Sequence, residues 1–148
     1  MSEKTIIIAS DHAGFERKAE LVAYLKQQNY EVNDLGPDNG ENSIDYPLKA
    51  EELATALQKD DTARGILVCG SGIGMCIAIN RYPFARGALV YDVEAARLSR
   101  QHNNANVLCL GGRMTDLETA KKLVDTFLTT PFEGGRHARR VLQLGGLK

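Results

Sequence analysis

Short apolar runs alternate along the chain with longer stretches in which apolar residues recur at helical spacing. The runs at 6–9, 66–69 and 107–110 are continuously apolar, which is typical of parallel strands covered on both faces. The pattern predicts strands at 4–9, 30–35, 65–69, 86–90 and 106–110. It predicts helices at 15–28, 47–59, 75–81, 93–102 and 115–129, and a further helical segment at about 134–145.

This alternation of strands and helices predicts an α/β fold, with a five-stranded parallel sheet, helices on both faces and right-handed crossovers. Ligands of open parallel sheets bind at the carboxyl ends of the strands, where the strand order reverses. The residues that directly follow each predicted strand are therefore the first candidates for chemistry. They lie at 10–14, 69–74, 91–92 and 111–113.

Length and composition narrow the class of protein. The 148 residues are 43% hydrophobic, so we expect one domain, residues 1–148, that needs no disulfide or metal to fold. A net charge of −1 gives no overall field to attract nucleic acid or a membrane surface. No apolar run approaches the ~20 residues of a membrane helix, and the run near the N-terminus is too short for a signal peptide. We therefore expect a cytoplasmic protein, whose three cysteines are free thiols.

A glycine-rich loop follows the third predicted strand, with Gly70, Gly72 and Gly74 just before a helix. Such a loop leaves backbone N–H groups free for an anion, although glycines can also simply permit a tight turn. Dinucleotide binding needs a small residue where this chain has Met75. A cysteine-phosphatase loop needs an arginine at that same position. The remaining alternative is a pocket in which the amides of 70–74 hold an enediolate oxygen.

Cys69 ends the strand directly beneath this loop. A lone cysteine is often an inert core residue, but a helix N-terminus favours the thiolate. Cys69 is therefore the candidate base, whereas Cys76 and Cys109 lack this setting and are interpreted as structural.

Other candidate groups have structural alternatives that remain open. Arg136 and Arg140 are four residues apart, so on a helix they could clamp one phosphate or form a solvated basic face. His12 could cap a turn, and His102 could cap a helix C-terminus. His137 points away from the arginine pair and is interpreted as incidental. The spacing shows no His/Asp/Glu cluster for a metal, so we expect no metal and no hydride shift on one.

Five segments, in this order along the chain, resemble those of the type B ribose-5-phosphate isomerases, which group with the allose- and galactose-6-phosphate isomerases. They are SDHAGF at 10–15, DYP at 45–47, CGSGIG at 69–74, SRQHN at 99–103 and EGGRH at 133–137. The resemblance extends from residue 5 to about 142 and implies a Rossmann-like three-layer αβα sandwich without a cofactor. It also implies a homodimer or a dimer of dimers with an active site shared between subunits. The segment at about 134–145 is expected to contribute to the dimer site.

The resemblance assigns roles to residues of this chain. Cys69 is implied as the general base, Ser71 as an aid to proton movement between O1 and O2, and His102 as the group that opens the sugar ring. The implied substrate-binding residues are Asp11, His12, Tyr46, Gly70, Ser71, Gly72, Ile73, Gly74, Asn103, Arg113, Arg136 and Arg140, the three arginines serving the phosphate. Some relatives use a loop glutamate instead of the cysteine, but Met75 places this chain with the cysteine type.

The expected reaction is the interconversion of ribose 5-phosphate and ribulose 5-phosphate through a cis-enediolate, in the pentose phosphate pathway. A six-carbon aldose 6-phosphate, allose or galactose 6-phosphate, remains an alternative substrate. A non-catalytic domain that binds a sugar phosphate or nucleotide remains an alternative function.

The predicted elements also place His102 relative to Cys69. The helix at 93–102 runs back along the sheet for about 15 Å, which places His102 at the edge opposite Cys69. We therefore expect a partner subunit to supply His102.

Overall fold

The computed structural model describes residues 5–145 and shows one parallel sheet of five strands in the order β2-β1-β3-β5-β4. The strands are β1 (Thr5–Ser10), β2 (Glu31–Asp34), β3 (Arg64–Cys69), β4 (Gly87–Leu89) and β5 (Val107–Gly111). The strands predicted from the sequence are confirmed within two residues at each end. The predicted start at Lys4 lies outside the described residues.

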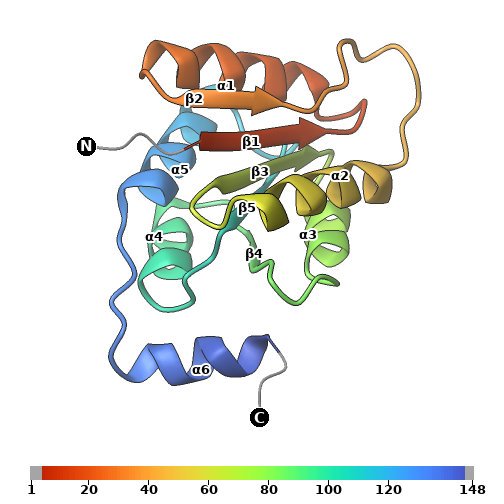
Figure 1. Cartoon of the computed structure of the whole chain (residues 1–148). Coiled ribbons are helices and arrows are strands. Elements are labelled where there is room, and N and C mark those ends of the chain that lie inside the picture. Colours follow the sequence, from red (N-terminus) through yellow and green to blue (C-terminus); the bar gives the residue numbers. More distant parts are fainter. Residues whose placement is uncertain (1–4, 146–148) are drawn as a thin grey trace.

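Helices cover both faces of the sheet, as Figure 1 shows. They are α1 (Phe15–Gln27), α2 (Tyr46–Lys59), α3 (Ile73–Ile79), α4 (Val93–Gln101), α5 (Leu117–Thr129) and α6 (Arg136–Leu144). One face carries α1, α4 and α5, and the other carries α2 and α3. The predicted three-layer αβα fold is therefore confirmed, and α6 lies apart from these layers (Figure 1).

Small shifts in two helix boundaries have local causes. The helix predicted at 115–129 begins at Leu117 because the Asp116 carboxylate accepts a hydrogen bond from Thr119 N–H at 2.8 Å, as an N-cap does. The helix predicted at 75–81 begins earlier, at Ile73, because Gly72 takes a left-handed conformation that turns the chain sharply out of β3.

The core consists of two apolar clusters separated by the sheet. Side chains alternate along each strand, so Ile6 and Ile8 face the layer of α1 and α5, while Ile7 faces α2. The central strands β1, β3 and β5 are almost wholly buried, which explains their continuous apolar runs. Among residues 5–145, no helix is both long and apolar enough to cross a membrane.

The strand order reverses between β1 and β3. The chain leaves β1 toward β2 on one side and returns to β3 on the other. Ser10 pairs with Val68, and Cys69 pairs with Gly111, so the loops after β1, β3 and β5 begin side by side at the carboxyl edge of the sheet. This is where ligands of such sheets bind.

Candidate active site

Cys69 lies at the centre of the carboxyl edge, with only 5% of its surface exposed. Its Sγ accepts a hydrogen bond from Gly72 N–H at 3.2 Å. The hydroxyl of Ser71 accepts one from Ile73 N–H at 3.1 Å. The loop therefore folds over the sulfur and fixes both side chains that the sequence nominated for proton transfer.

Only glycine fits at position 72. Its φ is +84°, and an added Cβ would lie 2.7 Å from Leu89 Cδ1 and 2.8 Å from the carbonyl carbon of Leu110. Both the backbone conformation and the space exclude a side chain. The predicted glycine loop is thus a compact turn that packs against Leu89 of β4 and Leu110 of β5.

The turn after β1 lies against this loop. Asp11 N–H donates to the Val68 carbonyl at 3.2 Å, and the Asp11 carboxylate accepts from Gly14 N–H at 2.9 Å. Asp11 therefore caps the turn, the role that the sequence suggested as an alternative for its neighbour His12. His12 Nδ1 accepts from Ile44 N–H at 3.0 Å, so a neutral His12 carries its proton on Nε2.

Tyr46 and Arg113 complete this edge. A Cβ at Gly74 would lie 2.7 Å from Tyr46 Cζ, so the tyrosine ring packs directly on the loop backbone. Arg113 N–H donates to the Gly70 carbonyl at 3.0 Å, which anchors the arginine beside the loop. The structure thus brings together the predicted residues of the first half of the chain and Arg113.

An open pocket of about 730 Å³ lies beside these groups. Its lining includes His12, Arg113 and, from α1, Arg17. Arg17 was not predicted from the sequence, because nothing in a helix pattern shows that this side chain reaches the loops. Two carboxylates, Glu16 and Glu41, also line the pocket. Its donors for an anion are therefore the two arginines and His12, placed next to acidic groups.

The remaining predicted residues lie elsewhere. His102 is the C-cap residue of α4, and its N–H donates to the Leu98 carbonyl at 2.9 Å. Asn103 follows in an exposed turn, and Arg136 and Arg140 are exposed on α6. In Figure 1, α4 ends and α6 begins at the edge of the sheet opposite the arrowheads of the strands. The chain therefore does not bring His102, Asn103, Arg136 or Arg140 to Cys69.

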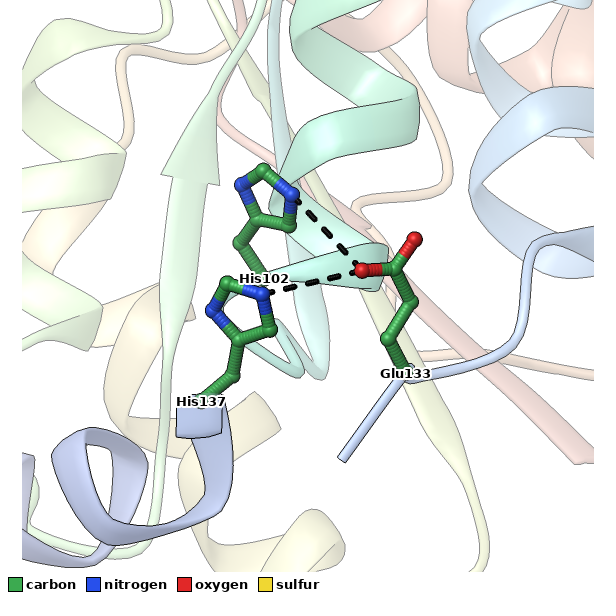
Figure 2. Close-up of side chains that lie close together, drawn as sticks. All are labelled: His102, Glu133 and His137. Carbon is green, nitrogen blue, oxygen red and sulfur yellow. Dashed lines mark ion pairs between the residues drawn. The ribbon is translucent and has the colours of Figure 1, made fainter. Parts of the chain in front are cut away.

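His102 instead joins a cluster that the sequence did not predict (Figure 2). Its ring stacks on that of His137, with centroids 4.3 Å apart and planes 12° apart. Glu133 Oε1 lies 3.8 Å from His102 Nε2 and 3.6 Å from His137 Nε2. Burial, followed by the neighbouring His102, lowers the pKa of His137.

One interpretation of the sequence is therefore wrong, because a group of potential metal ligands exists: the ligand atoms of His102, Glu133 and His137 lie within 4.8 Å of one another. Spacing along the chain missed this group because α4 and α6 approach only in the folded chain. That the reaction itself needs no metal stays a prediction. His137 packs on His102, and that it takes no part in the reaction stays a prediction.

Cys76 on α3 and Cys109 on β5 form a thiol pair between the helix and the sheet. A hydrogen bond with the Cys109 thiol lowers the pKa of Cys76 to about 7. The same hydrogen bond and full burial raise the pKa of Cys109. Cys76 is half-buried, as a structural cysteine would be. Its lowered pKa also favours the thiolate, which the sequence did not indicate.

The sequence model of the Ribose/Galactose Isomerase family matches residues 6–144. The chain belongs to this family. The resemblance that the five segments indicated is thereby confirmed.

Individual members of this isomerase family are similar over nearly the whole chain. Probable ribose-5-phosphate isomerase B of Mycoplasma pneumoniae is 47% identical over 136 residues, covering 92% of this chain and 90% of that protein. The structure of a ribose 5-phosphate isomerase from Thermotoga maritima has a TM-score of 0.95 at 45% identity, covering 99% and 100% of the two chains. Ribose-5-phosphate isomerase B from Mycoplasma genitalium, solved with bound ribulose-5-phosphate, has a TM-score of 0.94 at 41% identity, covering 99% and 97%.

Both groups of predicted residues fall inside the region that the isomerase family model matches. One group lies at the carboxyl edge around Cys69, and the other lies around the end of α4 and on α6. A functional assignment for this isomerase must explain how two separated groups act on one substrate.

Proposed function

We propose that the chain interconverts ribose 5-phosphate and ribulose 5-phosphate, with Cys69 as the general base. The observation that carries the proposal is the position of the Cys69 sulfur under a glycine loop at the reversal of strand order, on the same sheet edge as the donors His12 and Arg113. The related protein with bound ribulose-5-phosphate supports the choice of substrate.

The proton transfer follows from the loop geometry. The Cys69 thiolate removes the proton from C2 of the open-chain aldose. The electron pair of that C–H bond forms the C1–C2 double bond, and the π pair of the C1 carbonyl moves onto O1, which gives a cis-enediolate. The Ser71 hydroxyl passes the O2 proton to O1, the C2 carbonyl forms, and the electron pair of the C1–C2 double bond takes the proton back from the Cys69 thiol at C1. Neither step consumes a cofactor, and we expect none.

The developing oxygen charge requires fixed donors. Gly72 N–H and Ile73 N–H are engaged by Cys69 and Ser71, whereas the N–H groups of Ser71 and Gly74 donate to no acceptor among residues 5–145. Preorganised amides of this kind contribute several kcal/mol to a transition state that develops an oxyanion.

Ring opening must precede this chemistry, and His102 is the group we assign to it. Because Gly65 pairs with Val107 and Cys69 with Gly111, His102 and Cys69 are separated by more than the length of β5, about 13 Å. A side chain of the same subunit cannot span that separation. We therefore propose a dimer in which the partner subunit supplies ring opening and the phosphate ligands of α6.

Exposed apolar side chains support such an assembly. Ile77 on α3 and Leu142 on α6 are each 61% exposed, and Leu144 is 62% exposed. Burying them against a second copy removes this surface from water. A two-fold axis then forms two equivalent composite sites. A cytoplasmic location and the assembly into a dimer or a dimer of dimers remain predictions from the sequence.

Subunit mixing tests the shared site. Inactive Cys69→Ala and His102→Ala chains are unfolded together, refolded, and assayed. Half of randomly paired dimers are mixed, and each mixed dimer has one intact site, so recovery of about a quarter of wild-type activity is expected. Zero recovery from dimers shown to be mixed contradicts the shared site.

The substrate is tested by measuring kcat/KM side by side on ribose 5-phosphate, allose 6-phosphate and galactose 6-phosphate. We expect the pentose phosphate to be preferred. Preference for a six-carbon substrate would replace the substrate assignment and keep the mechanism. Turnover of none of the three would favour a non-catalytic sugar-phosphate-binding domain, which direct binding measurements would then identify.

A further inference from the structure

Ring opening is assigned to His102 alone, but His102 lies in a cluster with two further potential metal ligands, Glu133 and His137. Two imidazole Nε2 atoms face one carboxylate oxygen, at 3.8 and 3.6 Å (Figure 2). Two histidines and a glutamate are the protein ligands of one common class of zinc site, which keeps a fourth position for water.

The distances are close to those that a bound ion requires. Zinc binds imidazole nitrogen at about 2.0–2.1 Å and carboxylate oxygen at about 2.0–2.2 Å, so ligand atoms around a tetrahedral ion lie roughly 3.4 Å apart. The two measured pairs exceed this separation by a few tenths of an ångström. All three ligand atoms lie within 4.8 Å of one another. The planes of the two rings are 12° apart, so binding an ion also requires the rings to turn toward each other.

The backbone holds all three ligands in place. Glu133 N–H donates to the carbonyl of Gln101, the neighbour of His102, at 3.0 Å, which fastens the segment before α6 to the end of α4. Gly134 and Gly135 have φ values of +67° and +55°, and this turn returns His137 to the side of Glu133. The His137 side chain is 11% exposed, so packing keeps it on the side of α6 that faces His102.

We propose that His102, Glu133 and His137 bind a divalent transition-metal ion of the zinc class, and that the bound ion inhibits the enzyme by occupying His102. The inhibitory part rests on the proposed function, because it assumes that His102 opens the ring. Metal binding itself does not depend on that function. Mg²⁺ and Ca²⁺ prefer sites made only of oxygen ligands, so we expect neither to bind here.

Charge near the site limits its affinity. Arg136 and Arg140 act on His137 as positive charges, and Arg97 lies within range of Glu133. These three cations repel a bound metal ion and so weaken its binding. The site is therefore expected to bind zinc reversibly, so that EDTA restores a metal-free and fully active enzyme.

Calorimetric titration of the EDTA-treated full chain with Zn²⁺ tests the site without reference to activity. We expect one ion per chain for wild type. Because even changes in the groups around metal ligands weaken binding by about 10–100-fold, Glu133→Gln and His137→Asn should weaken it at least about tenfold. Glu118→Gln is the matched control, since Glu118 is an exposed carboxylate of α5 paired with Lys121, and it should bind as wild type does.

A thiol site is the main competitor, so the same titration is run on Cys69→Ala. Retained binding in Cys69→Ala supports the cluster, and its loss overturns the proposal. Wild-type affinity in folded Glu133→Gln and His137→Asn would also overturn it. Circular dichroism verifies folding, and Glu133→Gln preserves side-chain size and the backbone hydrogen bond to Gln101.

The inhibitory part is measured separately, with each protein compared with its own metal-free rate. Zn²⁺ should inhibit wild type reversibly, and Glu133→Gln should need at least about tenfold more Zn²⁺ for the same fractional inhibition. Zinc bound at the cluster without inhibition would overturn this part alone. If no protein is active, the proposed function fails, and calorimetry still decides the metal site.

Discussion

The two halves of the proposed site are built in opposite ways. The half around Cys69 sits on the ends of three buried strands, and backbone hydrogen bonds link its loops to one another. The half around His102 lies at the end of α4 and on α6, which stands apart from the sheet (Figure 1), with Arg136 and Arg140 exposed. The first half can be rigid within one chain, whereas the second would be completed by a partner in the proposed dimer.

In the proposed mechanism, this difference separates proton transfer at carbon from ring opening and phosphate binding. The group that breaks a carbon–hydrogen bond must be held within a fraction of an ångström, and a sheet edge provides such support. Groups that hold a phosphate tolerate more freedom, because long arginine side chains adjust to it. Substitutions in the two halves should therefore differ in what they change.

The largest effect is expected from Cys69→Ala. Loss of a general base lowers rates by about 10²–10⁴-fold, so kcat should fall by about 10³-fold or more while substrate binding and unfolding midpoint change little. A steady-state assay with calorimetric substrate binding measures this. Cys76→Ala is the matched control and should retain activity. An active Cys69→Ala enzyme would remove Cys69 from the mechanism.

A second comparison uses two glycines with positive φ. Gly72→Ala should lower the free energy of unfolding by about 2–4 kcal/mol, because a left-handed alanine costs about 1–2 kcal/mol and its Cβ would also overlap Leu89 and Leu110. At Gly134 nothing lies within 4 Å of an added Cβ. Gly134→Ala should therefore lower the free energy of unfolding only by the cost of a left-handed alanine, about 1–2 kcal/mol. Urea unfolding measures both, and equal losses would contradict the contrast between the halves.

The arginines of α6 should affect capture rather than chemistry. Arg136→Ala and Arg140→Ala should each raise KM about tenfold, because a hydrogen bond to a charged group contributes about 1.5–3 kcal/mol and phosphate binding acts equally on ground and transition states. Inorganic phosphate should compete with substrate less well in both variants. Arg139→Ala, the exposed α6 arginine to which no phosphate role is assigned, is the control. Unchanged KM in both variants would place the phosphate elsewhere.

The smallest effect concerns reactivity rather than turnover. Because Cys109 lowers the pKa of Cys76 to about 7, alkylation of Cys76 by iodoacetamide should be half-maximal near that pH instead of about 8.5 for an ordinary cysteine. Mass spectrometry follows each thiol separately. In Cys109→Ala the midpoint should rise. Substrate should protect Cys69 and leave Cys76 labelled, which separates inactivation from incidental modification.

The sequence by itself determined the class of fold and the half of the site around Cys69. Continuous apolar runs identify buried parallel strands, and residues that follow such strands meet at one edge for topological reasons. The position of Cys69, Gly72 and His12 could therefore be predicted without coordinates. The same rule placed His102 at the opposite edge, because a helix that follows a strand runs back along the sheet.

Only the tertiary structure decided what surrounds His102. Glu133 and His137 belong to a turn and a helix that follow the last strand, and no periodicity states where such a segment packs. Their approach to His102 depends on two glycines with positive φ and on one backbone hydrogen bond to Gln101. The position of Arg17 in the pocket and the pairing of Cys76 with Cys109 likewise depend on packing between elements that are distant in the sequence. Contacts between elements distant in sequence are set by packing, whereas strand order and local turns are set by the chain itself.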